Sequence, residues 1–87
     1  MKIKEGFVVR EIAGETVVVA LGKASKIFNG LIRLNGTAKI IWQKLASGCE
    51  REEIIEAILE EYEIDRETVE KDVDGFIEKL KGAKILE

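Results

Sequence analysis

The stretch LIRLNGTAKIIWQKL, residues 31–45, contains the change from strand-type to helix-type patterning that decides the fold. Residues 31–34 are apolar except for Arg33, and the turn pair Asn35-Gly36 follows them, which indicates a short strand. From there the apolar residues recur at helical spacing and predict a helix over 37–47. This stripe consists of Ala38, Ile41, Trp42 and Leu45. Asn35 or Thr37 can cap the start of the helix, and Gly48 suits a left-handed residue after its end.

Upstream of this stretch, two runs rich in β-branched residues predict a hairpin. The strands are expected over residues 7–12 and 16–21, and Gly14 in the turn between them can take a positive φ. Residues 23–26 are expected to form a loop. Because an isolated hairpin is marginal in water, the short strand over 31–34 should complete a three-stranded antiparallel sheet.

Downstream, two further amphipathic helices are predicted over residues 51–62 and 66–81. Asp65 is a good N-cap for the second of these, Ile64 and Val69 are placed to form a hydrophobic staple around it, and Gly82 can end it. The whole chain, 1–87, therefore reads as one α+β domain. Three N-terminal antiparallel strands followed by three helices, with a tight connection between the last two, predict a winged helix-turn-helix-like fold.

The composition of the 87 residues excludes most chemistry. The chain has no His and a single Cys49, so it offers no imidazole base, no CxxC-type metal or redox site and no internal disulfide. We therefore expect no catalytic residue, no metal ligand and no cofactor. No apolar run approaches the roughly 20 residues that a membrane span needs, and the N-terminus lacks the apolar region of a secretory signal, so a cytoplasmic protein without a membrane partner is expected.

Charge divides the chain into two halves. Residues 1–49 carry eight Lys or Arg and three Glu, whereas residues 50–87 carry six Lys or Arg and fourteen Asp or Glu. A winged helix-turn-helix order invites a DNA-binding or regulatory function, but a DNA-reading helix normally meets phosphates with Lys and Arg. Residues 65–82 carry six acidic and four basic side chains, which disfavours a nucleic-acid partner and leaves DNA binding as the alternative function.

The strand over 31–34 raises a different possibility. A three-stranded sheet leaves a strand edge unpaired, and its free N–H and C=O groups can accept an extended peptide as a further strand. The residues alone leave two other outcomes open, an edge covered by a loop and an edge paired with a second copy of the chain. Trp42 is expected to be a core anchor, whereas Phe76, an aromatic residue on an otherwise aliphatic stripe, can belong to the core, to a groove, or to both.

Several segments together resemble the PqqD family, named after coenzyme PQQ synthesis protein D. The first is FNGLIRLNGT at 28–37, followed by Ile41 and Trp42, and its most specific part is the Leu-Asn-x-Thr step at 34–37 into a helix that carries Ile-Trp. The opening GFVVREIAGE at 6–15, the run DRETV at 65–69 and the segment FIEKL at 76–80 are also similar. Members of the family tend to carry Gly where this chain has Lys84.

The resemblance implies a RiPP recognition element, a non-catalytic module that binds the leader of a ribosomally synthesised precursor peptide. In such modules the leader adds to the third strand, lies against the third helix, and is presented to a modifying enzyme, often a radical S-adenosylmethionine (radical SAM) protein. The expected partners are thus a leader peptide and such an enzyme, with the module a monomer or a weak homodimer. The residues expected to bind the peptide are Phe28, Leu31, Ile32, Arg33, Leu34, Val69, Val73, Phe76, Ile77 and Leu80.

Overall fold

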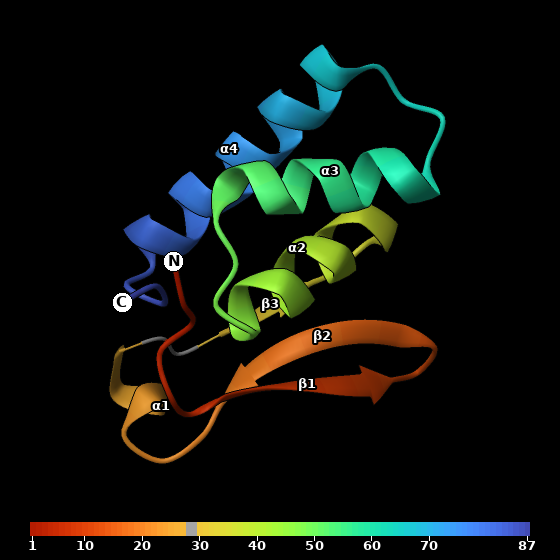
Figure 1. Ribbon diagram of the computed structural model, residues 1–87. Coiled ribbons are helices and arrows are strands. Elements are labelled where there is room, and N and C mark those ends of the chain that lie inside the picture. Colours follow the sequence, from red (N-terminus) through yellow and green to blue (C-terminus); the bar gives the residue numbers. More distant parts are fainter. Residues whose placement is uncertain (28–29) are drawn as a thin grey trace.

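The computed structural model describes residues 1–27 and 30–87, without the side chain of Ile27. Three strands form a small sheet, and three longer helices lie together on one side of it (Figure 1). In chain order the elements are β1 (Phe7–Ile12), β2 (Glu15–Ala20), α1 (Ala24–Ile27), β3 (Leu31–Arg33), α2 (Gly36–Ala46), α3 (Arg51–Glu61) and α4 (Arg66–Gly82). The predicted α+β class and the three antiparallel strands are confirmed.

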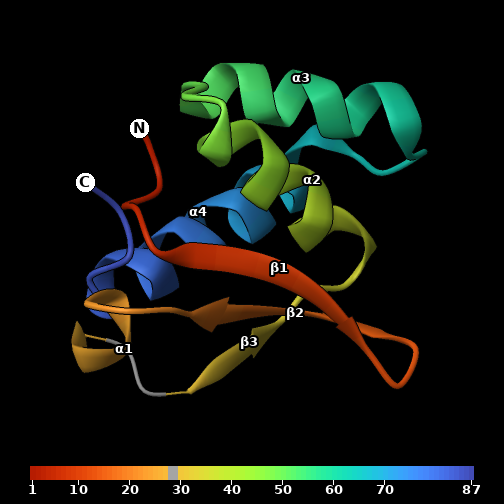
Figure 2. The ribbon, with the colours of Figure 1, turned by 90° about the horizontal axis from the view of Figure 1, so that it is seen from below.

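The sheet has the order β1-β2-β3, and both pairings are antiparallel (Figure 2). Ala13 and Gly14 connect β1 to β2 with φ values of 51° and 80°, the two successive positive values that a two-residue type I′ turn requires. Val18 of β2 lies opposite Val9 of β1 and Ile32 of β3. Because β2 is central, one edge of β3 has no neighbouring strand among the described residues.

The loop expected over residues 23–26 is wrong, because a short helix, α1, begins at Ala24. Its first residues are held to the turn that follows β2, where the amides of Ala24 and Ser25 donate to the carbonyls of Leu21 and Gly22 at 3.2 Å each. Ala24 is buried, and a Cβ placed on Gly6 would come within 2.7 Å of the Ala24 Cβ. A four-residue helix is too short to show a helical period, which is why the pattern did not reveal it.

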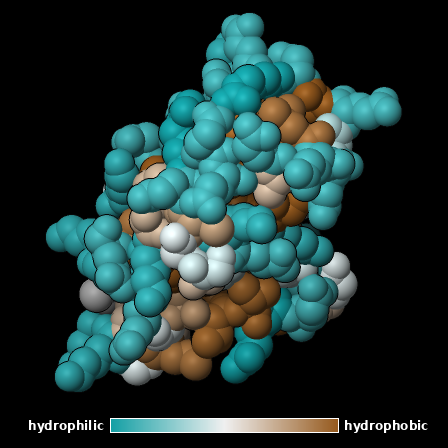
Figure 3. Space-filling model, in the orientation of Figure 1, coloured by the Kyte–Doolittle hydropathy of each residue, from teal (hydrophilic) through white to brown (hydrophobic). Residues whose placement is uncertain are grey.

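The core lies between the sheet and the longer helices. Each of these helices contributes an apolar stripe to it, and Trp42 is the core anchor that was expected, at 4% exposure. The buried members from the sheet and α2 are Val18, Ile32, Leu34, Ala38, Ile41, Trp42 and Leu45. Those from α3 and α4 are Ile54, Ile55, Ile58, Val69, Val73, Ile77 and Leu80. On the face seen in Figure 3, hydrophobic residues gather over the sheet, whereas the helical part is mostly hydrophilic.

Side-chain caps fix where the helices begin. The Asn35 side chain accepts a hydrogen bond from the Ala38 amide at 2.9 Å, so Asn35 is the cap of α2. Asp65 caps α4 in the same way through the Thr68 amide at 3.2 Å, as predicted. At the start of α3, the Glu53 carboxylate accepts from the Glu50 amide at 3.0 Å, which satisfies one backbone donor there.

The ends of α2 and α4 share one hydrogen-bonding pattern. After α2, the Cys49 amide donates to the Lys44 carbonyl at 3.0 Å across Gly48, whose φ is 85°. After α4, the Ile85 amide donates to the Leu80 carbonyl at 2.9 Å across Lys84, whose φ is 61°. Both are Schellman motifs, which favour glycine at the left-handed position. Helix α4 ends at Gly82 as expected, but Gly82 is itself helical, and the left-handed position after the helix is taken by Lys84.

The two terminal segments pair with each other. Ile3 and Leu86 form an antiparallel bridge, flanked by hydrogen bonds from the Lys4 amide to the Ile85 carbonyl at 2.8 Å and from the Glu87 amide to the Lys2 carbonyl at 2.9 Å. Figure 1 shows both ends of the chain on the same side of the molecule, near the last turn of α4. The C-terminal tail is thus engaged with the N-terminal segment and does not pair with β3. None of the helices in the described part of the chain has the length and apolar character needed to cross a membrane.

Candidate functional site

The outer edge of β3 presents main-chain groups that β2 does not use. The Leu34 amide donates to the Thr16 carbonyl at 2.9 Å, which makes these two residues a hydrogen-bonded pair. Directly opposed residues alternate between hydrogen-bonded and non-hydrogen-bonded pairs in an antiparallel ladder. Arg33 and Leu31, opposite Val17 and Val19, are therefore non-hydrogen-bonded pairs. Their N–H and C=O groups point away from β2, at the edge where an additional strand can join.

Side chains of β3 and the next residue alternate between the core and solvent. Ile32 and Leu34 are buried at 3% and 6% exposure, whereas Leu31 is 53% exposed and Arg33 is also exposed. The Arg33 guanidinium lies 3.4 Å from the Glu15 carboxylate on the neighbouring strand. Within β3, Leu31 and Arg33 are therefore the two side chains that a molecule on the outer face of the sheet can touch.

A groove of about 330 Å³ opens where β3 gives way to α2. One wall is the start of α2, with Asn35, Thr37, Ala38 and Ile41. The other wall is α4, with Lys71, Asp72, Gly75, Phe76 and Lys79. Since the groove begins two residues beyond β3, a peptide that continues along the strand edge can run into it. The site thus combines a main-chain edge with an adjoining pocket for side chains.

The residues of α4 that the sequence analysis expects to bind the peptide fall into two groups, those buried in the core and one that a ligand can reach. Val69, Val73, Ile77 and Leu80 are between 0% and 5% exposed and pack in the core, so their side chains do not line the groove. Phe76 is half-buried: it packs against the core and also lines the groove, which makes it the one member of the predicted set on α4 that a ligand can reach. Phe28 lies outside the described residues.

Sequence reasoning missed the residues that give the groove its shape. Lys71, Gly75 and Lys79 lie four residues apart along α4 and therefore form one row on its surface, beside the buried stripe. A signal was available in Gly75, since a glycine inside a predicted helix has low helix propensity and calls for a separate reason. The two lysines were indistinguishable from the other charged residues of an exposed helix face.

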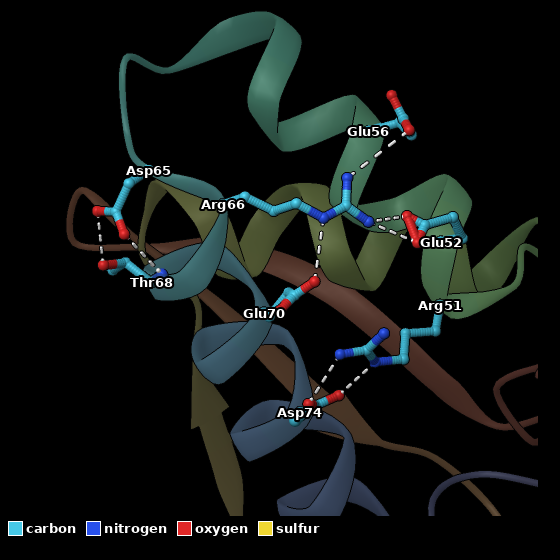
Figure 4. A network of polar contacts seen from close by, with 8 residues as sticks. All are labelled: Arg51, Glu52, Glu56, Asp65, Arg66, Thr68, Glu70 and Asp74. Carbon is cyan, nitrogen blue, oxygen red and sulfur yellow. Dashed lines mark hydrogen bonds and ion pairs between the residues drawn. The ribbon is translucent and has the colours of Figure 1, made fainter.

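The opposite side of α4 is tied to α3 by ion pairs (Figure 4). Arg51 on α3 makes two hydrogen bonds to the Asp74 carboxylate, at 2.7 and 3.0 Å, and these hydrogen bonds hold the pKa of Asp74 below its ordinary value. Arg66 on α4 contacts Glu52 and lies 3.0 Å from Glu70. These contacts raise the pKa of Arg66, Glu52 contributing most. All partners of the two arginines lie on α3 or α4, so this network lies between these two helices and away from the groove.

Another shifted carboxyl belongs to the cap of α4. The Thr68 hydroxyl donates to the Asp65 carboxylate at 2.8 Å, and the Thr68 amide donates to its other oxygen. These two hydrogen bonds lower the pKa of Asp65. Asp72, in contrast, lines the groove, so Asp72 and Asp74 face different sides of α4 and do not form a carboxylate pair.

In the described part of the chain, few side chains that could bind a metal ion or react lie close together. Within it, no three His, Cys, Asp or Glu side chains converge to hold a metal ion. Cys49 is half-buried, and its sulfur lies 3.5 Å from the Ser47 hydroxyl. The contacts that the site offers are main-chain groups of β3 and a groove lined by both polar and apolar side chains.

The family model for "Coenzyme PQQ synthesis protein D (PqqD)" matches residues 15–86. Among solved structures, the chain is 34% identical to one described as "TbiB1 in Complex with the TbiA(beta) Leader Peptide", with a TM-score of 0.78 and coverage of 100% of this chain and 95% of that chain. A second, "Lasso peptide synthetase B1 complexed with the leader peptide", is 23% identical with a TM-score of 0.74, over 97% of this chain and 93% of that chain, and shows the shared fold. None of the curated proteins is similar to the chain at a significant level. The match over residues 15–86 shows that this chain belongs to the PqqD family.

Proposed function

We propose that this chain is a non-catalytic module that binds the leader of a ribosomally synthesised precursor peptide by strand addition and presents it to a modifying enzyme. The observation that carries the proposal is the open outer edge of β3 beside the groove formed by α2 and α4. The leader would pair with the main chain of Leu31 and Arg33 and place side chains against Phe76. In this mode the main-chain bonds supply affinity, and the side-chain pocket supplies specificity.

Two findings support a peptide as the ligand. The solved relative that is 34% identical carries a leader peptide, and the chain covers nearly all of that protein. In addition, the terminal tail of this chain is occupied at the Ile3–Leu86 bridge, so it does not compete for the edge of β3. An open strand edge is prone to non-specific pairing with other chains, and a dedicated peptide ligand would account for this edge being left open.

The enzyme that receives the leader belongs to the same proposal. The PqqD family takes its description from the synthesis of coenzyme PQQ, and a radical SAM enzyme is the partner we propose, in a pathway to PQQ or to another modified peptide. The module itself would need no cofactor, because binding and presentation require no bond chemistry. Because precursor peptides are made by ribosomes, this function implies a module in the cytoplasm. We propose that the module is a monomer or a weak homodimer.

DNA binding has less support from the surface charges. Residues 50–63 carry seven acidic side chains and one basic side chain. The five that lie within α3 are all exposed. Phosphates of a nucleic acid would be repelled by this surface, and its single basic side chain, Arg51, is already paired with Asp74. Retention of the protein on double-stranded DNA at low salt would revive this alternative.

The proposal can be tested with a displayed library of random 15-residue peptides selected on the immobilised full-length protein. The peptide that is enriched most strongly, called the probe peptide below, is then titrated into isotope-labelled protein while backbone amide shifts are recorded. We expect the largest shifts in β3 and in the α4 residues around Phe76. Failure of the library to yield any binding peptide, or shifts confined to α3, would overturn the proposed function.

A proline in β3 tests the main-chain contact itself. Leu31→Pro removes an N–H that points away from β2, so the β2–β3 ladder keeps its hydrogen bonds. Affinity for the probe peptide should fall at least about tenfold, since one main-chain bond is lost and the ring obstructs the incoming strand. Leu31→Ala, which keeps the N–H, serves as the matched control and should retain most of the affinity. Equal losses in the two variants would show that the Leu31 side chain matters and its amide does not.

A further inference from the structure

Gly75 stands in the interior of α4, where glycine is a poor choice for stability. Its neighbours on both sides are helical, and glycine loses more conformational freedom on folding than any residue that carries a side chain. Residues that disfavour their own element persist where a packing or functional reason retains them. The surroundings of Gly75 therefore decide whether the free protein supplies such a reason.

Neither the packing nor the backbone of the free protein requires glycine here. A Cβ built on Gly75 meets no atom within 4 Å, in contrast to Gly6, where a Cβ would come within 2.7 Å of Ala24. The φ of Gly75 is also outside the left-handed region that favours glycine, unlike that of Gly48. An alanine would fit at position 75 and would favour the helix.

The position of Gly75 in the groove supplies the missing reason. Lys71 and Lys79 lie one turn before and one turn after it on the same row of α4, and all three residues line the groove. Long side chains thus stand on both sides of a position that has no side chain, and Phe76 lies next to it, half-buried. The result is a gap in the α4 wall, bordered by two lysines, the Asp72 carboxylate and an aromatic ring.

We propose that Gly75 is a specificity-determining residue, and that the gap in the α4 wall receives one bulky apolar side chain of the bound peptide, seated against Phe76. This inference rests on the proposed peptide-binding function and adds which kind of side chain the groove selects. A β-carbon at position 75 would occupy the space that the peptide side chain needs, although it is harmless to the free protein. Stability and binding are therefore expected to respond to it in opposite directions.

The test compares Gly75→Ala and Gly75→Leu with wild-type protein. We expect both variants to melt at or above the wild-type temperature. Affinity for the probe peptide should fall about threefold in Gly75→Ala and at least about tenfold in Gly75→Leu. Gly82→Ala is the matched control, because Gly82 is helical, has open space around its Cβ position and does not line the groove. It should leave the affinity within twofold of wild type.

Alanine substitutions along the probe peptide identify the side chain concerned. One bulky apolar residue should be found whose replacement weakens binding to wild-type protein, and the peptide without it should bind wild type and Gly75→Leu equally well. Unchanged affinity of Gly75→Leu for the probe peptide would overturn this inference while leaving the proposed function intact. Failure of wild-type protein to select any peptide would instead overturn the function, so the two failures are distinguishable.

Discussion

The two sides of α4 differ in how completely they are occupied. Towards the core and α3, the helix buries Val69, Val73, Ile77 and Leu80 and adds the ion pairs of Arg51 and Arg66. Towards the groove, it presents a row with a gap at Gly75 and the half-buried ring of Phe76. One side of the same helix completes the core, and the other leaves contacts for a ligand.

This difference shows how a small domain keeps a binding site in shape. A chain of 87 residues buries a limited core, so each helix must contribute to it. Apolar packing and ion pairs hold the inner side of α4 in place, so the residues on the groove side do not have to contribute contacts that position the helix. Substitutions on the two sides should therefore separate into losses of stability and losses of binding.

The largest effect is expected from Leu80→Ala on the closed side. Leu80 has no exposed surface, and its carbonyl also accepts the hydrogen bond from Ile85 that ends α4. Truncating a fully buried leucine lowers the free energy of unfolding by about 2–5 kcal/mol, a large share of the stability of so small a domain. Urea denaturation followed by circular dichroism measures the loss. A change below about 1 kcal/mol would show that this part of the core relaxes freely around the cavity.

Phe76→Ala should have a smaller effect on stability and a distinct effect on binding. The ring is half-buried and lines the groove, so its removal takes apolar contact from both the core and the ligand. We expect affinity for the probe peptide to fall about tenfold, which corresponds to about 1.4 kcal/mol. The neighbouring substitution Ile77→Ala is the control, because Ile77 faces the core: it should lower the melting temperature and leave the affinity of the folded protein unchanged. Calorimetric titration at a temperature where both variants are folded distinguishes these outcomes.

The sequence was sufficient for most of the fold because its periods are clear. The hairpin follows from the β-branched runs on either side of Gly14, and α2 follows from the spacing of its apolar residues from Ala38 to Leu45. Asn35 and Asp65 are caps because the side chain of each accepts a hydrogen bond from a backbone amide three residues later. Helix α1 could not be found, since four residues carry no period and Ala24 is buried by a contact with Gly6 that is distant in sequence. Local patterns predict local structure well, whereas tertiary contacts decide short elements.

The site was predictable only in part, for a related reason. The alternation of a strand is enough to separate Leu31 and Arg33 from Ile32 and Leu34, because a strand has only two faces. The stripe on α4 gave the apolar residues but not the direction of the groove, so Val69, Val73, Ile77 and Leu80 were grouped with Phe76. Which flank of a helix stays open depends on where α2 begins, and this position is set by the three-dimensional packing.

One substitution after the end of α4 should raise the stability of the protein and leave peptide binding unchanged. Lys84 holds a left-handed conformation at the position where α2 has Gly48, and both positions complete a Schellman motif. A side chain with a Cβ pays a steric penalty there, so Lys84→Gly should raise the free energy of unfolding by up to about 1 kcal/mol. Since Lys84 does not line the groove, affinity for the probe peptide should not change. Gly48→Lys is the reciprocal control and should lower the melting temperature.

The smallest effect concerns the ion pair that joins α3 to α4. The pKa of Asp74 is lowered mainly by the hydrogen bonds from Arg51, so the folded state favours the carboxylate. The stabilisation is therefore fully present above the ordinary carboxyl pKa of 3.8 and is lost as the pH falls through the lower pKa of the folded state. Asp74→Asn should melt slightly below wild type at pH 7, and this difference should vanish in acid.

The control for this measurement is Asp72→Asn, which removes a carboxylate from the groove side of the same helix and leaves the seam to α3 intact. Melting curves of the three proteins between pH 2 and pH 7 give the comparison. Salt should also reduce the Asp74 effect, because the pair is exposed to solvent and its attraction is screened. If Asp72→Asn reproduced the whole pH dependence of Asp74→Asn, the effect would come from the overall negative charge of the second half of the chain. The contact with Arg51 would then have no measurable part in holding the closed side of α4.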